Sequence, residues 1–183
     1  MNEENTDFGP LIAKAKNGDR EAFREVFELL SDKLFAYALS HTKSRDDALD
    51  ITQDTFIDIW TALPRFTYKD RSSFYAFIFV IMKRKLARHY KVKNTRNEVP
   101  FDENSMDESY EMKIEDFLGV SRLINSLPSK YQEVLRLRYW SSLPFNMIAL
   151  YLDITETTAK VWHHRALKKL QNVLDKQGYE FKN

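Results

Sequence analysis

Aspartates are concentrated in one short stretch of the chain. Positions 46, 47, 50, 54 and 58 all carry aspartate. Carboxylates are ligands that Mg²⁺ prefers, and a magnesium site there would suit phosphoryl chemistry. On a helix, however, the spacing of Asp50, Asp54 and Asp58 places them on one exposed stripe, with no convergent ligand from another segment and no obvious nucleophile. We therefore expect no catalytic residues, no metal site and no cofactor, and interpret the stretch as an acidic helix face.

Basic residues are clustered as well. Seven basic residues and no acidic one occur from Lys83 to Arg96, and a second group lies in the last third of the chain at His163, His164, Arg165, Lys168 and Lys169. Between these clusters, from Glu98 to Asp116, eight acidic residues accompany a single lysine. The net charge of +1 averages over this asymmetry. A basic block suits a polyanion such as DNA, although on charge alone an ordinary solvated face explains it equally well.

The composition predicts a mostly helical protein that stays out of the membrane. The chain has 183 residues, 43% of them hydrophobic, with only four glycines, five prolines and no cysteine. This is enough for one domain or two small ones, and it excludes disulfides and thiolate metal sites. The start of the chain lacks the features of a signal peptide. The longest apolar run, Phe74 to Met82, is about half a membrane span. These features predict a cytoplasmic protein.

Apolar periodicity predicts three helices in the first half of the chain. The first two cover about 19–41 and 44–60, with Asp19 and Ser44 as N-caps. In the second, apolar side chains turn inward and the outer face keeps polar ones; the inward set is Ala48, Ile51, Phe56, Ile59 and Trp60. Pro64 ends this helix, and Ser72 or Ser73 is expected to cap a third helix over about 73–93, apolar at first and basic at its end.

The last third has the pattern of a helix-turn-helix. Helices are expected over about 129–140 and 144–152, followed by a tight turn and a final helix capped by Thr155. The inward residues of this last helix are predicted to be Ala159, Ala166, Leu167 and Leu170. The second helix of such a motif enters the DNA major groove. Its outward residues would meet base edges (Thr157, Thr158, Lys160, Val161 and Trp162) or phosphates (His164, Arg165 and Lys168).

The quoted motifs resemble a known family. "LPSKYQEVLRLRYW" and "IALYLDITETTAKVWHHRALKKL" resemble region 4 of the bacterial sigma factors, notably the extracytoplasmic-function (ECF) group. "DDALDITQDTFIDIW" resembles region 2.2, and "RSSFYAFIFVIMKRKLARHY" resembles regions 2.3 and 2.4. The resemblance implies an all-α protein of two small helical domains, region 2 at 1–96 and region 4 at 117–183, joined by a flexible acidic linker at 97–116.

The resemblance also implies partners and contact residues. A sigma factor binds core RNA polymerase through the β′ coiled coil and the β flap of the polymerase. It also binds promoter DNA. Many sigma factors are held inactive by an anti-sigma factor. The polymerase-docking surface corresponds to Asp50, Gln53, Asp54 and Phe56. The surface that recognises and melts the −10 element corresponds to Phe66, Tyr68, Arg71, Ser73, Tyr75, Lys83, Arg84 and Arg88. The −35 element would be recognised by the final helix. For the aromatic residues, stacking on bases and filling the core both remain open.

Some positions depart from the family pattern. Asp153 replaces the glycine usual in the turn of the helix-turn-helix, and aspartate tolerates left-handed backbone better than most residues. Arg88 stands where many members have aspartate. His163 occupies a position that is usually leucine, where a buried imidazole is expected. Trp162 could touch a base or cover the core. A stand-alone helix-turn-helix repressor remains the alternative function, but a repressor would give the segment "DDALDITQDTFIDIW" no function.

Overall fold

The computed structural model describes residues 7–42, 44–96 and 120–176, and all of the regular structure in these ranges is helical. The chain divides into two compact units, Met1–Glu98 and Val99–Asn183, each of which is described by itself. The all-α expectation is confirmed. The expected linker at 97–116 lies outside the described residues, so the domain bounds remain predictions. None of the described helices combines the length and apolar character needed to cross a bilayer.

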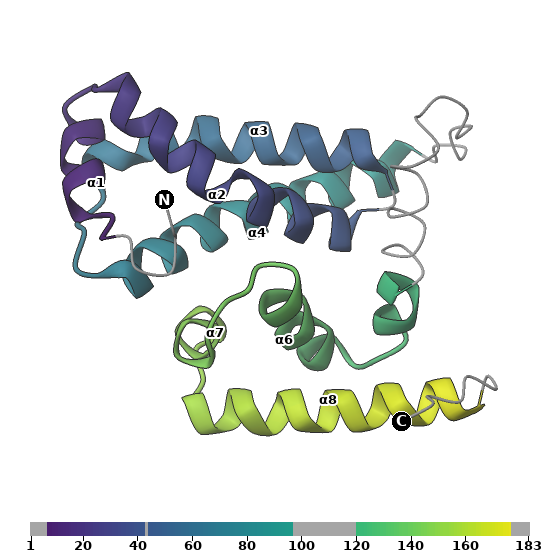
Figure 1. Cartoon of the computed structure of the whole chain (residues 1–183). Coiled ribbons are helices and arrows are strands. Elements are labelled where there is room, and N and C mark those ends of the chain that lie inside the picture. The colour runs from purple at the N-terminus through teal and green to yellow at the C-terminus, as the bar shows by residue number, and fades with distance from the viewer. Residues whose placement is uncertain (1–6, 43, 97–119, 177–183) are drawn as a thin grey trace. The chain divides into compact units, whose positions relative to one another are not determined.

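The first unit contains five helical elements (Figure 1): α1 (Gly9–Lys16), α2 (Arg20–His41), α3 (Arg45–Ala62), the short 3₁₀ helix η2 (Leu63–Arg65) and α4 (Arg71–Arg96). Helix α3 packs against both α2 and α4, and α1 packs against α2 and η2. The sequence analysis missed α1, a short helix without a side-chain cap. Its available signal was Pro10 in the first turn, where proline is favoured because no intrahelical N–H is needed.

Local capping sets where the longer helices begin. Asp19 accepts hydrogen bonds from the backbone N–H groups of Glu21 and Ala22, and Ser44 Oγ accepts one from Asp47, as predicted. The cap of α4 was predicted wrongly as Ser72 or Ser73. The helix begins two residues earlier, at Arg71, because Asp70 Oδ1 accepts from the Ser73 N–H at 2.7 Å while Ser73 Oγ accepts from the Asp70 N–H at 3.1 Å. This reciprocal pair is a capping box.

The core of the first unit is built from α2, α3 and the apolar first half of α4. Phe74, Ile78, Phe79 and Met82 are all buried, whereas most of the basic side chains described after them on α4 are exposed. Tyr37 of α2 meets Phe79 edge-on, with ring centroids 5.0 Å apart. The residues of α4 change from apolar to basic along its length because mainly its first half is buried in the core.

The second unit comprises helical residues 120–125, α6 (Ser129–Tyr139), α7 (Phe145–Leu152) and α8 (Glu156–Lys176). Helix α8 packs against both α6 and α7. The core of the second unit includes a cluster made by Ile124, Leu127, Tyr131, Leu135 and Ala166. Ala159 is also fully buried, as predicted, but Leu167 is 37% exposed and was wrongly placed inward. Small alanines let α8 approach its neighbours closely, and Leu167 lies one position beyond the buried Ala166.

A left-handed residue joins α7 to α8. Asp153 has φ 54° and ψ 50°, which confirms that aspartate takes the place of the usual glycine at this turn. Thr155 then caps α8, because its Oγ1 accepts from the Thr158 N–H at 3.1 Å. Helices α7 and α8 with this turn form the predicted helix-turn-helix.

Candidate protein and nucleic-acid interfaces

Helix α3 presents one polar outer face. Asp50, Gln53 and Asp54 are exposed there, as predicted from their spacing. Ile57, one turn further on, is 61% exposed and shares this face. The sequence analysis missed Ile57, although an apolar residue seven positions after Asp50 was the available signal. We call Asp50, Gln53, Asp54 and Ile57 the α3 face.

Phe56 does not belong to the α3 face. Its side chain is only 4% exposed, and its ring lies 4.5 Å from that of Phe27 and 6.4 Å from that of Phe23, centroid to centroid. The prediction that Phe56 contacts a partner therefore needs correction. It faces α2 because it is rotated about 100° around the helix from Ile57, and it holds α3 in place.

Lys85 belongs to the basic block of α4 but faces α3. Its Nζ lies 2.9 Å from Asp58 Oδ2 and 3.5 Å from Asp54 Oδ2. The Lys85 side chain is 15% exposed, whereas that of Asp54 is 62% exposed. Lys85 thus offsets part of the negative charge at one edge of the α3 face, while Asp54 stays open to solvent.

The loop formed by residues 66–70 connects η2 to α4 and carries two half-buried aromatic rings. The Phe66 ring stacks on Phe77 at 4.3 Å, and Tyr68 lies edge-on to Phe74 at 6.4 Å, centroid to centroid. Both rings keep part of their surface accessible. They are the aromatic side chains of the loop, and their accessible surface could stack on a base.

Other residues predicted for this surface serve the fold. Tyr75 is 2% exposed, so its placement on a DNA-contacting surface is corrected to a place in the core. Phe74, expected to be core, is fully buried. Ser73 is engaged in the capping box of α4. Arg71 lies over the Tyr75 ring at 5.5 Å and is half-buried.

A basic stripe continues along α4 beyond the 66–70 loop. Lys83, Arg84 and Arg88 are exposed, as predicted. Arg84 lies two turns after Phe77 and Arg88 one turn later, so the two arginines continue the helix face on which Phe66 stacks. Cations in such a row suit the phosphates of a nucleic-acid strand leaving the loop.

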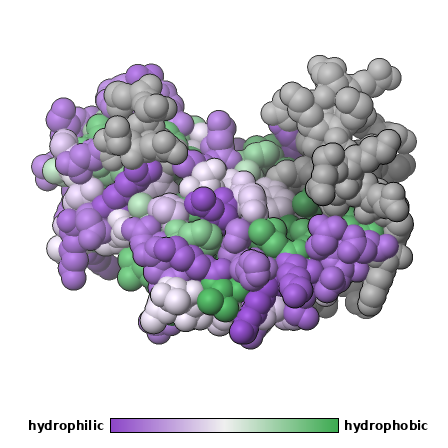
Figure 2. All heavy atoms as spheres, turned by 60° about the horizontal axis from the view of Figure 1, so that its bottom comes forward, coloured by the Kyte–Doolittle hydropathy of each residue, from purple (hydrophilic) through white to green (hydrophobic). Residues whose placement is uncertain are grey.

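Helix α8 presents a polar face with one apolar member. Six of the exposed residues of α8 follow helical spacing on this face: Thr157, Lys160, Val161, His164, Arg165 and Lys168. Val161 is 39% exposed, and Lys160 Nζ pairs with Glu156 at 2.7 Å. In Figure 2, where the α8 side of Figure 1 is turned forward, hydrophilic residues surround separate apolar ones. We call these six residues the α8 face.

Two residues predicted to contact base edges instead make contacts within the second unit. The Thr158 hydroxyl is 2.8 Å from that of Thr155, and this half-buried side chain completes the helix cap. Trp162 packs against the core cluster of the second unit, and Lys130 Nζ lies over its ring at 5.3 Å. Of the two roles left open for Trp162, the structure supports covering the core.

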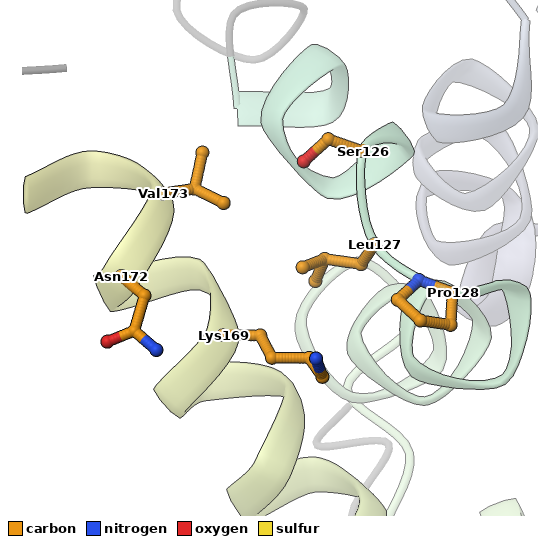
Figure 3. A pocket seen from close by; sticks show the side chains of 6 residues that line it. All are labelled: Ser126, Leu127, Pro128, Lys169, Asn172 and Val173. Atoms are coloured by element: carbon orange, nitrogen blue, oxygen red, sulfur yellow. The ribbon is translucent and has the colours of Figure 1, made fainter. Parts of the chain in front are cut away.

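A shallow groove lies on a different side of α8. Its walls are Ser126, Leu127 and Pro128 from the segment before α6, and Lys169, Asn172 and Val173 from α8 (Figure 3). The stick view shows the apolar side chains of Leu127 and Val173 beside the aliphatic stem of Lys169. Lys169 therefore does not share the face of its neighbour Lys168. No group of three or more histidine or acidic side chains placed to hold a metal occurs among residues 7–42, 44–96 and 120–176.

His163 of α8 lies where α6 and α7 meet this helix. Its Nε2 is 3.1 Å from Tyr139 Oη on α6, and its ring lies 5.2 Å from that of Phe145 on α7. The expectation of a buried imidazole is met only in part, because the residue is half-buried. Burial is the main cause that lowers the pKa of His163 below 6.5, and the positive charges of Arg138 and His164 add to it.

This lowered pKa predicts that the second unit loses stability in mild acid. The unfolded chain binds more protons between the folded pKa and 6.5, so stability rises with pH through that window and is lost as pH falls below 6.5. Hydrogen exchange of α8 in urea, at pH about 5.5 and about 7.5, measures this difference. His163→Leu is expected to remove most of it, and the control His164→Gln to keep most of it. Equal pH dependence in wild type and His163→Leu would contradict the assignment.

The fold defines a two-unit helical protein of the helix-turn-helix class, and comparison with known proteins assigns the family. The family model "Sigma-70 region 2" matches residues 26–96, and "Sigma-70, region 4" matches residues 118–170. The chain belongs to the sigma-70 family, in its ECF group.

Named relatives agree with this assignment. The chain is 26% identical over 171 residues to the ECF RNA polymerase sigma factor BldN of Streptomyces coelicolor, covering 90% of this chain but only 64% of BldN, less than two thirds of its length. It is 27% identical over 180 residues to SigD of Mycobacterium tuberculosis, covering 92% of this chain and 84% of SigD.

Two solved structures share the fold. CnrH, solved in complex with the cytosolic domain of CnrY, aligns with a TM-score of 0.70 at 23% identity, covering 91% of this chain and 96% of CnrH. The sigma factor RpoE of Bartonella quintana, solved with the anti-sigma factor NepR, aligns with a TM-score of 0.62 at 21% identity, covering 84% of this chain and 96% of RpoE.

Proposed function

We propose that this chain binds core RNA polymerase and directs promoter-specific transcription initiation. The observation that carries the proposal is the presence in one chain of a region 2 unit and a region 4 helix-turn-helix, in family order. A stand-alone repressor would need only the second unit, and it would leave the α3 face without a partner. In this proposal the protein performs no covalent chemistry, needs no cofactor and works in the cytoplasm beside the polymerase.

The α3 face is the proposed docking surface for the β′ coiled coil. Asp50 and Asp54 supply negative charge, Gln53 supplies an amide, and Ile57 supplies exposed apolar surface at the same patch. Acidic groups around a small apolar centre suit a basic amphipathic helical partner. The β flap is the second proposed polymerase contact. Two modest contacts through one chain raise the effective concentration of each DNA-binding unit at the promoter.

Lys85 is expected to compete with the polymerase for Asp54. Replacing it with methionine removes the ion pair to Asp54 and Asp58 and leaves both carboxylates free for a basic partner. Exposed ion pairs contribute up to about 1 kcal/mol, so Lys85→Met should tighten docking by up to about fivefold. Fluorescence anisotropy with core polymerase measures this, with Lys14→Met on α1 as the control. Weaker docking by Lys85→Met would show that Lys85 supports the interface.

DNA recognition divides between the two units. Phe66 and Tyr68 are proposed to stack on unpaired bases of the −10 element, while Arg71, Lys83, Arg84 and Arg88 bind its phosphates. The α8 face is proposed to enter the major groove at the −35 element. There Thr157, Lys160 and Val161 meet base edges, and His164, Arg165 and Lys168 meet phosphates.

A protein regulator is the remaining proposed partner. CnrH and RpoE, which share this fold, were solved with the cytosolic domain of CnrY and with the anti-sigma factor NepR. We propose that an anti-sigma factor covers the surfaces that bind polymerase. Co-expression of this chain with the products of neighbouring genes should yield a complex with the anti-sigma factor. The chain should bind polymerase only after it is released from that complex. The absence of any such complex would count against this partner.

The test of the whole proposal is reconstitution with core RNA polymerase. Titration of labelled protein should give saturable binding, and the holoenzyme should start transcripts from specific sites on genomic DNA that core polymerase alone ignores. Binding to duplex DNA without any affinity for polymerase would instead identify a repressor.

A further inference from the structure

The N-terminal segment Asp7–Lys16 holds the 66–70 loop at two points. Lys16 Nζ, at the end of α1, donates a hydrogen bond to the backbone carbonyl of Phe66 at 2.6 Å. Tyr68 Oη donates one to Asp7 Oδ1 at 3.0 Å. The same carboxylate oxygen accepts from the Gly9 N–H at 2.9 Å, which fixes Asp7 against the start of α1. Residues distant in the sequence are thus joined beside the two aromatic rings of the loop.

Packing reinforces these hydrogen bonds. Phe8 is fully buried, with its ring 5.2 Å from Phe74 and 6.0 Å from Tyr75. Gly9 lies so close to Tyr68 that an added Cβ would come within 3.1 Å of Tyr68 Cε1. The segment therefore forms a seat for the Tyr68 ring. The far end of the loop is fixed separately, by the capping box between Asp70 and Ser73.

We propose that Asp7 and Lys16 are positioning residues for −10 recognition, which hold the 66–70 loop in one conformation so that Phe66 and Tyr68 are ready to stack on unpaired bases. This rests on the proposed function of the loop. Residues 66–70 lie between η2 and α4 and belong to neither helix. A loop that is ordered in advance loses less conformational entropy when it captures a base.

The chemistry distinguishes the roles of the two residues. Lys16 acts as a donor to one carbonyl, so another cationic donor of similar length should replace it. Asp7 acts as an acceptor, and its negative charge opposes an approaching phosphate. An asparagine should therefore keep the useful contact, and an alanine should not. Burial, followed by the hydrogen bond to Asp7, raises the pKa of Tyr68 above 10.0, so the hydroxyl keeps its proton for this bond.

The experiment measures promoter melting by reconstituted holoenzyme. The probe is a promoter duplex selected by the wild-type holoenzyme from a randomised library, with 2-aminopurine in its −10 element to report unstacking. Lys16→Met and Asp7→Ala are expected to lower the melting equilibrium by about tenfold, as for loss of one charge-assisted hydrogen bond. Lys16→Arg and Asp7→Asn should restore it. Lys14→Met, an exposed lysine on the same helix, should match wild type.

Two further readouts separate positioning from general damage. Affinity for core polymerase should be unchanged in every variant, and the thermal unfolding midpoint should fall by no more than the few degrees expected for one lost hydrogen bond. Base preference within the −10 element should relax in Lys16→Met and Asp7→Ala. Wild-type melting in both of these variants would overturn the inference, and so would a melting loss that persists in Asp7→Asn or that accompanies weakened polymerase binding. If wild type itself neither binds polymerase nor melts DNA, the proposed function fails and this inference fails with it.

Discussion

The double variant Asp50→Lys, Asp54→Lys should bind core RNA polymerase at least about 100-fold more weakly than wild type. Both carboxylates are exposed on the α3 face, so the new lysines would stand directly against a basic partner. Juxtaposed like charges at an interface cost several kcal/mol, and each 1.4 kcal/mol corresponds to about a tenfold change in affinity. Anisotropy titration of labelled protein with core polymerase at fixed salt measures the loss.

A matched control separates a local effect from a change in net charge. Glu25→Lys, Asp32→Lys alters the charge by the same amount at exposed positions of α2. It should bind nearly as wild type does, and both double variants should keep their helical content because surface substitutions change stability little. If the control lost as much affinity as the α3 variant, the interaction would be a diffuse charge effect. Undiminished binding by the α3 variant would remove this face from the docking surface.

The second large effect is expected at the −35 element. Replacing Arg165 and Lys168 with alanine should weaken promoter binding by the holoenzyme by about tenfold or more and reduce its salt dependence. Each phosphate contact contributes about 0.9 to the slope of log affinity against log salt concentration, so the loss of two should lower that slope by about 1.8. Binding isotherms on duplex promoter DNA between about 50 and 200 mM salt measure both quantities.

The control for this prediction removes two cations of the same unit from other faces. Arg122 is exposed on helical residues 120–125, and Lys169 lines the groove beside Leu127 and Pro128. Arg122→Ala, Lys169→Ala should leave the salt slope close to that of wild type. A slope that drops equally in both pairs, or in neither, would contradict the assignment of Arg165 and Lys168 as phosphate contacts.

Short-range physics explains why the helices and their caps could be predicted from sequence. Asp19, Ser44 and Thr155 cap helices as expected, because a cap depends only on side-chain chemistry within three residues. Helical spacing likewise predicted the exposure of Asp50, Gln53 and Asp54. The left-handed turn at Asp153 follows from the same local logic.

The roles of residues on half-buried faces depended on the tertiary structure. Helical spacing shows which side chains share a face, but not which neighbouring element covers that face. Phe56 is covered by Phe23 and Phe27 of α2, and Tyr75 lies in the core against Phe8, so neither is available to a partner. Lys85 belongs to the basic block that the sequence shows on α4, but the structure pairs it with acids of α3.

The sequence by itself determined the helical class, most helix positions, the helix-turn-helix and, through its motifs, the family. Only the tertiary structure revealed a partly buried polar network in which Arg136 donates to Gln132 and Asn125, and the contacts by which Asp7–Lys16 holds the 66–70 loop. Helix starts and exposed stripes follow from interactions within a few residues. A contact such as that from Lys16 to Phe66 spans 50 positions, and it exists only after the core has folded the chain back on itself.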